Sequence, residues 1–426
     1  MGFGHMAARR EKISRWESGH VVPDLTTQFA MAHLHTVPRN EVILRGWPQW
    51  LRIAIGENEL CFLPWTSEGA TAALRAVAEK PRVVPAAFPA TAGDSGAALV
   101  DDWLAAVDNV PAPGRIGRDI NADVAAIVET RVDALELMER RIQPRVLLPV
   151  ARSELDLLSS LLLRAGNDQE ATARLQVLAS RVSYLGSVLA FACGEFALRE
   201  NLLLVCMRAA TAGGAPGMAA IALASLASLH LDLGATGDAQ NLVTASRKIA
   251  DRTDPIPRLD ALLHCRQAWI HAQLGETKDS QRSFSSALTT YNAEPTMKSP
   301  WTIFRISEEL LQLTAGVSEM ALGQPVKALN HFSLLTHDDP SGTYSPSIVA
   351  IYLPDVIDAQ LAVGEVEAAV DTVRKAQGSL QGTDSKLPQH LKQRFSSYRT
   401  VPAVRDLMDR VAGDRSRVCR TGKDFT

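Results

Sequence analysis

The stretch "LHLDLGATGDAQNLVTAS", residues 229–246, has the pattern of two helices joined at a glycine. Gly234 follows a long segment rich in Ala and Leu, and glycine commonly ends a helix. Ala239 comes five residues later, Val243 nine residues later and Ser246 twelve residues later. A small fifth residue lets two helices approach closely, and a larger ninth residue fills the groove between them. The stretch therefore predicts a helical hairpin.

The same pattern recurs along the second half of the chain. After Gly234, glycines follow at intervals of 41, 48 and 41 residues, and each is preceded by Leu or Val. After each glycine, the fifth position again holds a small residue and the ninth a larger one. The twelfth position holds a small residue in two of the three cases. These sets are Gly275 with Ser280, Phe284 and Ala287, Gly323 with Ala328, Phe332 and Leu335, and Gly364 with Ala369, Val373 and Ala376. Gly194 lies 40 residues before Gly234, but Arg199 departs from the pattern at its fifth position.

This spacing resembles the second half of the tetratricopeptide repeat. The intervals exceed that family's repeat of about 34 residues, so the connecting loops must be longer. The resemblance implies an all-α chain in which helical hairpins from about residue 120 to 380 stack into a curved right-handed solenoid. The anchors Gly234, Gly275, Gly323 and Gly364 should lie at the hairpin turns. The alternative is an ordinary helical bundle in which the glycines recur by chance.

A different pattern opens the chain, in "REKISRWESGHVVPDLTTQFAMAHLHTV", residues 10–37. Ile13 and Trp16 are three residues apart, so they share one face of a helix. Gly19 is suited to end that helix, and Asp24 can cap a second one. Two short helices with a tight joint and basic side chains on the exposed face are what a helix-turn-helix presents to DNA.

The order Ile13, Ser14, Trp16, Glu17, Gly19 and Pro23 resembles the second half of the phage-repressor-type (XRE-type) helix-turn-helix. In that family two further helices come first, whereas only "MGFGHMAAR" precedes this stretch. A docked remnant, a late start codon and a shortened chain are all compatible with these residues. The resemblance implies that DNA is contacted from one helix, by Arg9, Arg10, Lys12, Ser14 and Arg15. Ile13 and Trp16 should pack inward, and Glu17 should accept hydrogen bonds at the turn near Gly19.

Composition and charge support this organisation. Apolar residues make up 46% and charged residues 21% of the 426 residues, which indicates a globular chain. Residues 1–52 hold seven basic and four acidic residues, and residues 381–426 hold ten and five, although the net charge is −3. The two terminal segments are thus basic and the residues between them are acidic. This distribution fits an N-terminal domain that contacts DNA, attached to a scaffold that repels nucleic acid. The five scattered cysteines and the absence of a signal segment or a long apolar run predict a cytoplasmic protein with reduced thiols and no membrane contact.

Four regions follow from these patterns. Residues 1–55 are predicted as a partial helix-turn-helix domain, 56–118 as a linker with short helices, 119–380 as the repeat domain and 381–426 as a basic C-terminal helix and tail. The Pro- and Ala-rich segment 81–100 is the clearest linker. Helices are expected over "INADVAAIVETRVDALELMERRI", residues 120–142, and over residues 144–164. The whole order resembles a family of actinobacterial regulators with C-terminal tetratricopeptide-like repeats.

The sequence predicts a binding function rather than a catalytic one. The chain has no phosphate loop, dinucleotide fingerprint, zinc-protease or serine-hydrolase motif, so no enzyme, cofactor or metal site is expected. The first hypothesis is a DNA-binding transcription regulator, acting as a homodimer, whose array senses a peptide, a small molecule or a protein partner. The second is an interaction scaffold that has lost independent DNA binding. Neither the sensed ligand, the operator nor the direction of regulation follows from the sequence.

Overall fold

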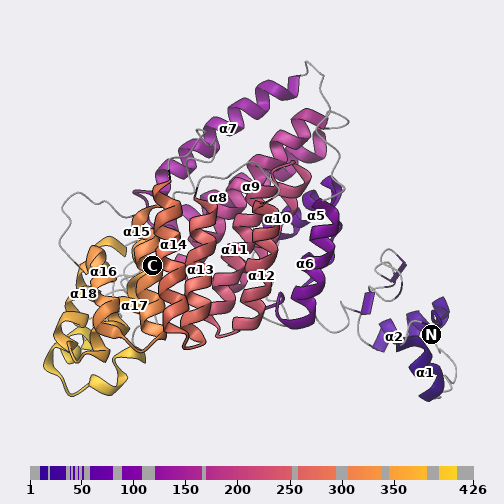
Figure 1. Cartoon of the computed structure of the whole chain (residues 1–426). Coiled ribbons are helices and arrows are strands. Elements are labelled where there is room, and N and C mark those ends of the chain that lie inside the picture. Colours follow the sequence, from indigo (N-terminus) through magenta and orange to yellow (C-terminus); the bar gives the residue numbers. More distant parts are fainter. Residues whose placement is uncertain are drawn as a thin grey trace, which may run out of the picture.

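Helices make up the structure, a computed structural model that describes residues 10–17, 20–34, 39, 42–43, 47, 50–51, 58–79, 89–107, 120–165, 169–251, 258–293, 306–336, 345–380 and 393–409. These residues contain no β-strand, so the prediction of an all-α chain is confirmed for them. The helices of the main body stand beside one another (Figure 1), and each helix from α9 to α17 contacts the next one along the chain.

Hairpins follow one another from residue 169 to residue 380, whereas the predicted series began at about residue 120. Each hairpin consists of two antiparallel helices that contact each other along their length. The pairs are α9 (Gln169–Ala192) with α10 (Phe196–Ala212), α11 (Pro216–Asp232) with α12 (Thr236–Ala250), α13 (Leu259–Gln273) with α14 (Thr277–Asn292), α15 (Glu308–Ala321) with α16 (Pro325–Thr336), and α17 (Pro346–Ala362) with α18 (Val366–Leu380).

A glycine lies at the turn of every hairpin. Gly194 and the four anchors Gly234, Gly275, Gly323 and Gly364 have φ between 69° and 85°, the left-handed conformation that L side chains avoid. At Gly234, the backbone N–H of the next residue, Ala235, donates to the carbonyl of His230 at 2.8 Å, which closes a Schellman turn. The predicted turn positions are therefore confirmed, and Gly214 forms an equivalent turn between α10 and α11 that the spacing did not reveal.

The small residues after these glycines are the contact points within the hairpins. Ala239, Ala328 and Ala369 are fully buried and Ser280 is 4% exposed. On the facing helix of one hairpin, a side chain at Gly316 would meet the ring of Phe332 at 2.4 Å, so α15 and α16 approach closely at that glycine. The fifth-position pattern thus reports helix packing, as predicted.

The region 56–118 contains more than a linker. Its helices α5 (Ser67–Glu79) and α6 (Gly93–Val107) pack on the body, α5 against α8 and α10 and α6 against α12. Leu74, Leu99 and Trp103 are buried in the same core as the hairpins, together with Leu60 of the short helix η1 (Glu59–Cys61). The prediction of short helices holds, but these helices are amphipathic and bury their apolar faces, so this region is part of the body.

Helices α7 (Ile120–Glu139) and α8 (Pro144–Arg164) have the bounds that the sequence predicts, apart from the last residues of the first. They pack on α9, and α7 is tied to it by Arg181, which pairs with Glu136 at 2.5 Å and Asp133 at 2.6 Å. By length and composition α9 could also span a membrane, although the sequence predicts no apolar run long enough to do so. However, 72% of its apolar window is buried among other helices, as in the core helix of a globular fold.

The C-terminal residues 393–409 cover the end of the array. Phe395, Val404 and Leu407 are buried against apolar residues of α17 and α18, beside the short helix η2 (Ser396–Tyr398). The sequence predicts this segment as part of a basic C-terminal helix and tail. Its apolar residues cap the last hairpin, as the ends of stacked helical arrays require.

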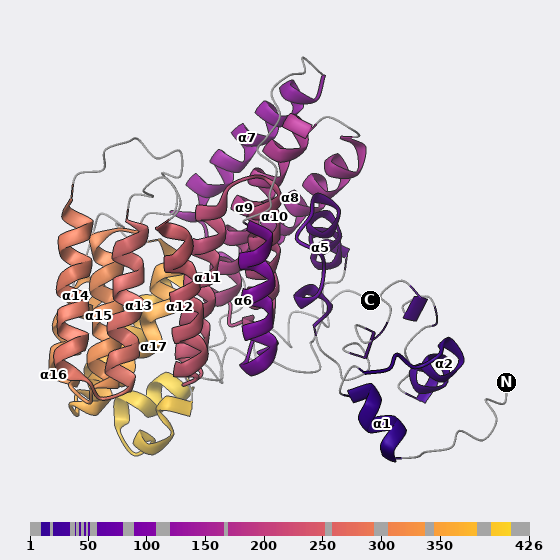
Figure 2. The same cartoon turned by 45° about the vertical axis from the view of Figure 1, so that its right-hand side comes forward.

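The N-terminal helices α1 (Arg10–Glu17) and α2 (Leu25–Leu34) lie apart from the body in both views (Figures 1 and 2). Asp24 caps α2 as predicted, because its carboxylate accepts the backbone N–H of Thr27 at 2.8 Å. A small separate core contains Ala32, Val42 and Trp50. The indole N–H of Trp50 donates to the side chain of Gln28 at 3.0 Å.

The inward packing that the sequence predicts for Ile13 and Trp16 differs between the two residues. Ile13 is 40% exposed and Trp16 is half-buried, and neither belongs to the buried cluster of the head. The physical reason is the composition of α1, whose only two apolar residues among eight are Ile13 and Trp16. Such a helix has little apolar surface to hold it against α2, and the head core forms instead around Trp50.

Candidate ligand cavity

A cavity of about 420 Å³ lies inside the array of hairpins. Its walls come from α7, from the first helix of every hairpin (α9, α11, α13, α15 and α17) and from one residue of α10, whereas α12, α14, α16 and α18 contribute none. Helices α9 and α17, from the first and last hairpins, contact each other. The first helices therefore surround the cavity, and cavities of a few hundred Å³ are of the size that small ligands occupy.

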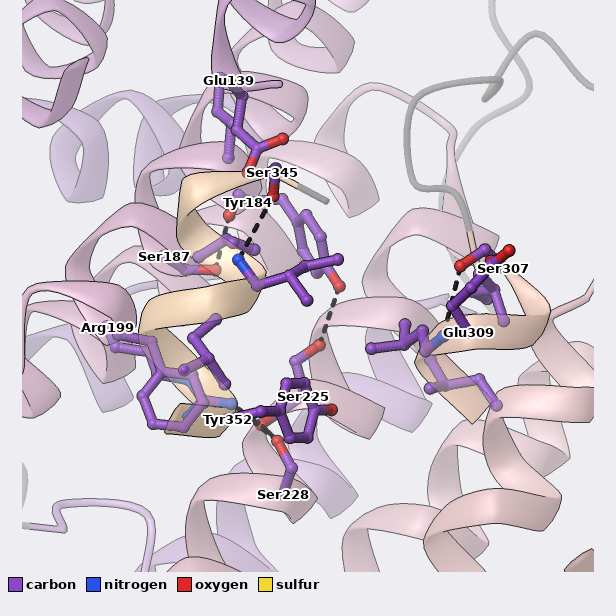
Figure 3. Close-up of a pocket in the computed structure, with 18 of the residues that line it drawn as sticks. Glu139, Tyr184, Ser187, Arg199, Ser225, Ser228, Ser307, Glu309, Ser345 and Tyr352 are labelled. Atoms are coloured by element: carbon purple, nitrogen blue, oxygen red, sulfur yellow. Dashed lines mark hydrogen bonds between the residues drawn. The ribbon is translucent and has the colours of Figure 1, made fainter. Parts of the chain in front are cut away.

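Arg199 is the residue that α10 contributes. Its guanidinium donates to the hydroxyl of Ser228 at 2.7 Å and to the carbonyl of Ser225 at 3.2 Å, and it stacks on the ring of Phe191 at 3.7 Å. Figure 3 shows Arg199 reaching toward Ser228. An amino group of the same guanidinium lies 3.6 Å from the carboxylate of Asp232. Arg199 is thus held on several sides.

Burial weakens the charged forms of this pair. It lowers the pKa of Arg199 to about 10 and raises the pKa of Asp232 to about 6, while Arg199 and Arg266 oppose the latter shift. The side chain of Asp232 keeps 31% of its surface accessible. Because Asp232 lines the cavity, that surface can be reached by a small molecule.

A second cation and a second carboxylate face the cavity from α13 and α17. Arg266 is 8% exposed, and its Nε donates to the carbonyl of Ala224 at 3.3 Å. Asp355 lies on α17, directly after Pro354, which interrupts the hydrogen bonds of that helix. Burial raises the pKa of Asp355 to about 7, Asp232 and Asp358 add to the shift, and Arg394 opposes it.

Two tyrosines and a set of apolar side chains complete the walls. The hydroxyl of Tyr184 accepts a hydrogen bond from Ser225 at 3.2 Å, as Figure 3 shows, and the hydroxyl of Tyr352 lies 3.4 Å from that of Thr314. Burial raises the pKa of both tyrosines, so their hydroxyls remain neutral donors and acceptors. The apolar part of the lining includes Leu262, Trp269, Leu310, Val317, Ile348 and Ile351. Chemically, the cavity can bind and orient a ligand that has both charged and apolar parts.

The opposite side of α10 holds the segment that leads to α6. Glu200, which is fully buried, accepts the backbone N–H groups of Ala90 at 3.0 Å and Thr91 at 2.9 Å and the hydroxyl of Thr91 at 2.6 Å. The ring of buried His230 lies 2.9 Å from the same hydroxyl, and burial lowers its pKa. Thr91 is therefore fixed to α10 and α11.

The residues that the sequence singled out for DNA contact stand elsewhere. Ser14 and Arg15 are exposed on α1, and Arg10 and Lys12 belong to the same helix, although their side chains, like that of Glu17, are outside the described part. Arg9 and Gly19 lie outside the described residues. None of these residues lines the cavity, and the anchor glycines lie at turns rather than in its walls.

The cavity residues were missed, although the sequence carries a signal for each. Arg199 is the one fifth-position residue that departs from the small-residue pattern, and it is the guanidinium that α10 places in the cavity. Asp232 and Asp355 interrupt the apolar segments "LHLDLG" and "YLPDV". A charge within an apolar helix is costly to bury without a reason, and this signal could have identified all three.

Among the described residues, no group of three or more His, Cys, Asp or Glu side chains is placed to hold a metal ion. Comparison with known proteins adds no identification, since no protein-family model, no curated protein and no solved structure matches this chain.

Proposed function

We propose that this protein is a DNA-binding transcription regulator whose helical array senses a ligand in the internal cavity. The observation that carries this proposal is the cavity itself, which is surrounded by the first helices of all five hairpins and lined by charged groups that a stable core does not need. The resemblance of residues 10–37 to a phage-repressor-type helix-turn-helix supports the DNA-binding part. The capped helix α2 and the small core around Trp50 fit a folded head.

The contacts of α10 supply a route from ligand to head. Arg199 of this helix contacts the cavity, and the next residue, Glu200, holds Ala90 and Thr91 in the chain segment between the head and α6. A ligand that shifts α10 would change how this segment is held, and thereby the position of the head. In the proposed function the protein works as a cytoplasmic homodimer, because repressor-type heads usually read two half-sites one turn of DNA apart.

Selection of duplexes from a random-sequence pool tests DNA binding directly. The full chain is used, beside a version extended by the in-frame codons upstream, and the affinity of selected and random duplexes is measured at several salt concentrations. We expect a selected two-fold symmetric sequence to bind at least about 1000-fold more tightly than random DNA. Arg15→Ala and Arg10→Ala should each weaken binding or reduce the salt slope by about one. If both leave affinity and salt slope unchanged, α1 does not contact DNA.

The exposure of Ile13 favours a second candidate function. A helix whose apolar residue is 40% exposed and outside the head core is poorly held for reading DNA. In this alternative the array is an interaction scaffold without independent DNA binding. The two are separated by the same selection experiment, because a scaffold enriches no sequence from the pool in either the given or the extended version.

A further inference from the structure

The guanidinium of Arg266 forms few interactions with other groups of the protein. Its Nε donates to one backbone carbonyl, and the ring of Trp269 lies 6.0 Å from its central carbon, at the limit of a cation–π contact. Among the described residues, no carboxylate lies within ion-pair distance of it. Arg266 lines the cavity, so its remaining N–H groups are available to a ligand. A planar guanidinium with free N–H groups is suited to bind a carboxylate through two parallel hydrogen bonds.

Asp355 is the complementary group. The cation that acts on it is Arg394, but Arg394 pairs with Asp358 at 2.8 Å, and within the described chain Asp355 itself forms no ion pair. Its other charged neighbour, Asp232, is a carboxylate that already faces Arg199. Asp355 therefore lies in the cavity wall with two other carboxylates, Asp232 and Asp358, acting on it. Such an arrangement favours a bound cation.

Tyr352 lines the cavity together with Arg266 and Asp355. It lies three residues before Asp355 on α17, so both side chains share a face of that helix. Arg266 lowers and Asp355 raises the pKa of the Tyr352 hydroxyl, so both charged groups act on this residue. Among the described residues no ion pair joins Arg266 to Asp355, and both line the cavity together with Tyr352.

The remaining walls indicate the body of the ligand. Leu262, Ile348 and Ile351 are apolar and belong to α13 and α17, the helices that carry Arg266 and Asp355. The volume of about 420 Å³ lies at the lower end of the range for small-molecule sites, so a long peptide does not fit inside. Buried charges without partners are costly, and one ligand with two opposite charges satisfies both.

We infer that the cavity binds a compact zwitterion with an apolar body, of the amino-acid or dipeptide type, whose carboxylate pairs with Arg266 and whose ammonium pairs with Asp355. This inference rests on the proposed sensing function, because it names the class of ligand for the same cavity. It does not depend on the head, since the residues involved all belong to α13 and α17.

Capped ligands test the inference on the unchanged full chain. The probes are leucine, phenylalanine, tryptophan and the nine dipeptides that these three residues form, each compared with its N-acetyl and its C-amide form by calorimetry and thermal shift. We expect at least one free probe to bind with a Kd below about 1 mM, and each cap to weaken it at least about tenfold. The inference is overturned if no free probe binds in this range, or if either capped form binds as well as the free one.

Two substitutions assign each end of the ligand. Arg266→Gln should abolish the discrimination against the C-amide and leave that against the N-acetyl form, whereas Asp355→Asn should do the reverse. A purely structural role would weaken all forms alike, which would contradict the assignment. Arg282→Gln and Asp371→Asn serve as controls, because their side chains are 75% and 62% exposed and away from the cavity.

Failure of the inference and failure of the proposed function can be told apart. DNA selection is carried out without any probe, so enrichment of a sequence there, together with no binding of any probe, rejects only the ligand class. Binding of a free probe without selection of DNA instead rejects the regulator and leaves a ligand-binding scaffold.

Discussion

Arg199 and Glu200 are consecutive residues of α10, yet the first contacts the ligand cavity and the second holds Thr91 in the segment before α6. Consecutive residues of a helix point about 100° apart, so one helix can serve two surfaces. A displacement of α10 by a ligand would therefore act directly on the hydrogen bonds at Thr91.

Glu200→Ala should release residues 89–107 while the hairpins stay folded. The substitution leaves the buried N–H groups of Ala90 and Thr91 without their acceptor, which costs on the order of 2–4 kcal/mol locally. We expect hydrogen exchange in α6 to increase by about 30-fold or more. Glu195→Ala is the matched control, because Glu195 is exposed and forms no capping hydrogen bond at the same helix. Equal exchange in both variants would show that Glu200 does not hold this segment.

Two glycines only three residues apart should respond to alanine in opposite directions. Gly234 has φ of 75°, so Gly234→Ala should destabilise the protein by about 1–2 kcal/mol. Gly237 lies in the first turn of α12 with open space around it, so Gly237→Ala should stabilise the protein by up to about 1 kcal/mol. Urea unfolding of both variants checks the pair. The turn assignment at Gly234 fails if its replacement is neutral.

The sequence predicted the features that depend on residues close together in the chain, and it did not predict those that depend on contacts between distant residues. The turn at Gly234 and the buried Ala239 depend on local backbone geometry and close packing, which leave a regular spacing in the sequence. The docking of Thr91 on Glu200 and His230 joins residues more than a hundred positions apart, and no periodicity reports such a contact.

The cavity was less predictable for the same reason. Its walls include α9 and α17, which contact each other although they are distant in the sequence, and no local spacing reports such a contact. In the sequence, Arg199 differs from its surroundings only as an exception to the repeat. In the head, the cap at Asp24 was predicted from a local rule, whereas the exposure of Ile13 depends on which partners surround α1.

The close approach at Gly316 predicts a compensating pair of substitutions. Gly316→Ala introduces a Cβ at 2.4 Å from the ring of Phe332, so we expect a loss of about 1–3 kcal/mol in the free energy of unfolding. Phe332→Leu alone removes buried aromatic volume and should cost a similar amount. The double variant should lose less than the sum, by about 1 kcal/mol, because the smaller side chain makes room for the new methyl group. Additive losses in urea unfolding would contradict the close contact.

The head depends on one buried indole. Trp50→Phe keeps most of the ring but removes the N–H that donates to Gln28 at 3.0 Å, which should destabilise the head by about 1–2 kcal/mol. Trp47→Phe is the control, since Trp47 packs edge-on against Trp50 and is only half-buried. Hydrogen exchange in α2 should rise in the first variant and stay near the original value in the second. A rise confined to the hairpins would exclude a separate core in the head.

Asp355→Asn should stabilise the ligand-free protein, and more so as the pH rises. The folded-state pKa of about 7 lies above the value of 3.8 for a free aspartic acid, so the folded protein holds this proton more tightly. The resulting stabilisation is present in full below the lower value and is lost as the pH rises through about 7. Asparagine mimics the protonated form at every pH. The advantage of the variant should therefore grow by about 2 kcal/mol between about pH 5.5 and about pH 8.

Urea unfolding at both pH values measures this difference, with Asp371→Asn as an exposed control. Asp232 and Asp358 raise the pKa of Asp355 and Arg394 lowers it, but these groups are present in both proteins, so the comparison isolates Asp355. An advantage that is equal at the two pH values would show that the Asp355 carboxylate is not desolvated in the cavity wall. A ligand ammonium seated at Asp355 would lower the pKa of this carboxyl, so a saturating zwitterionic probe should reverse the trend and make the original protein the more stable one at the higher pH.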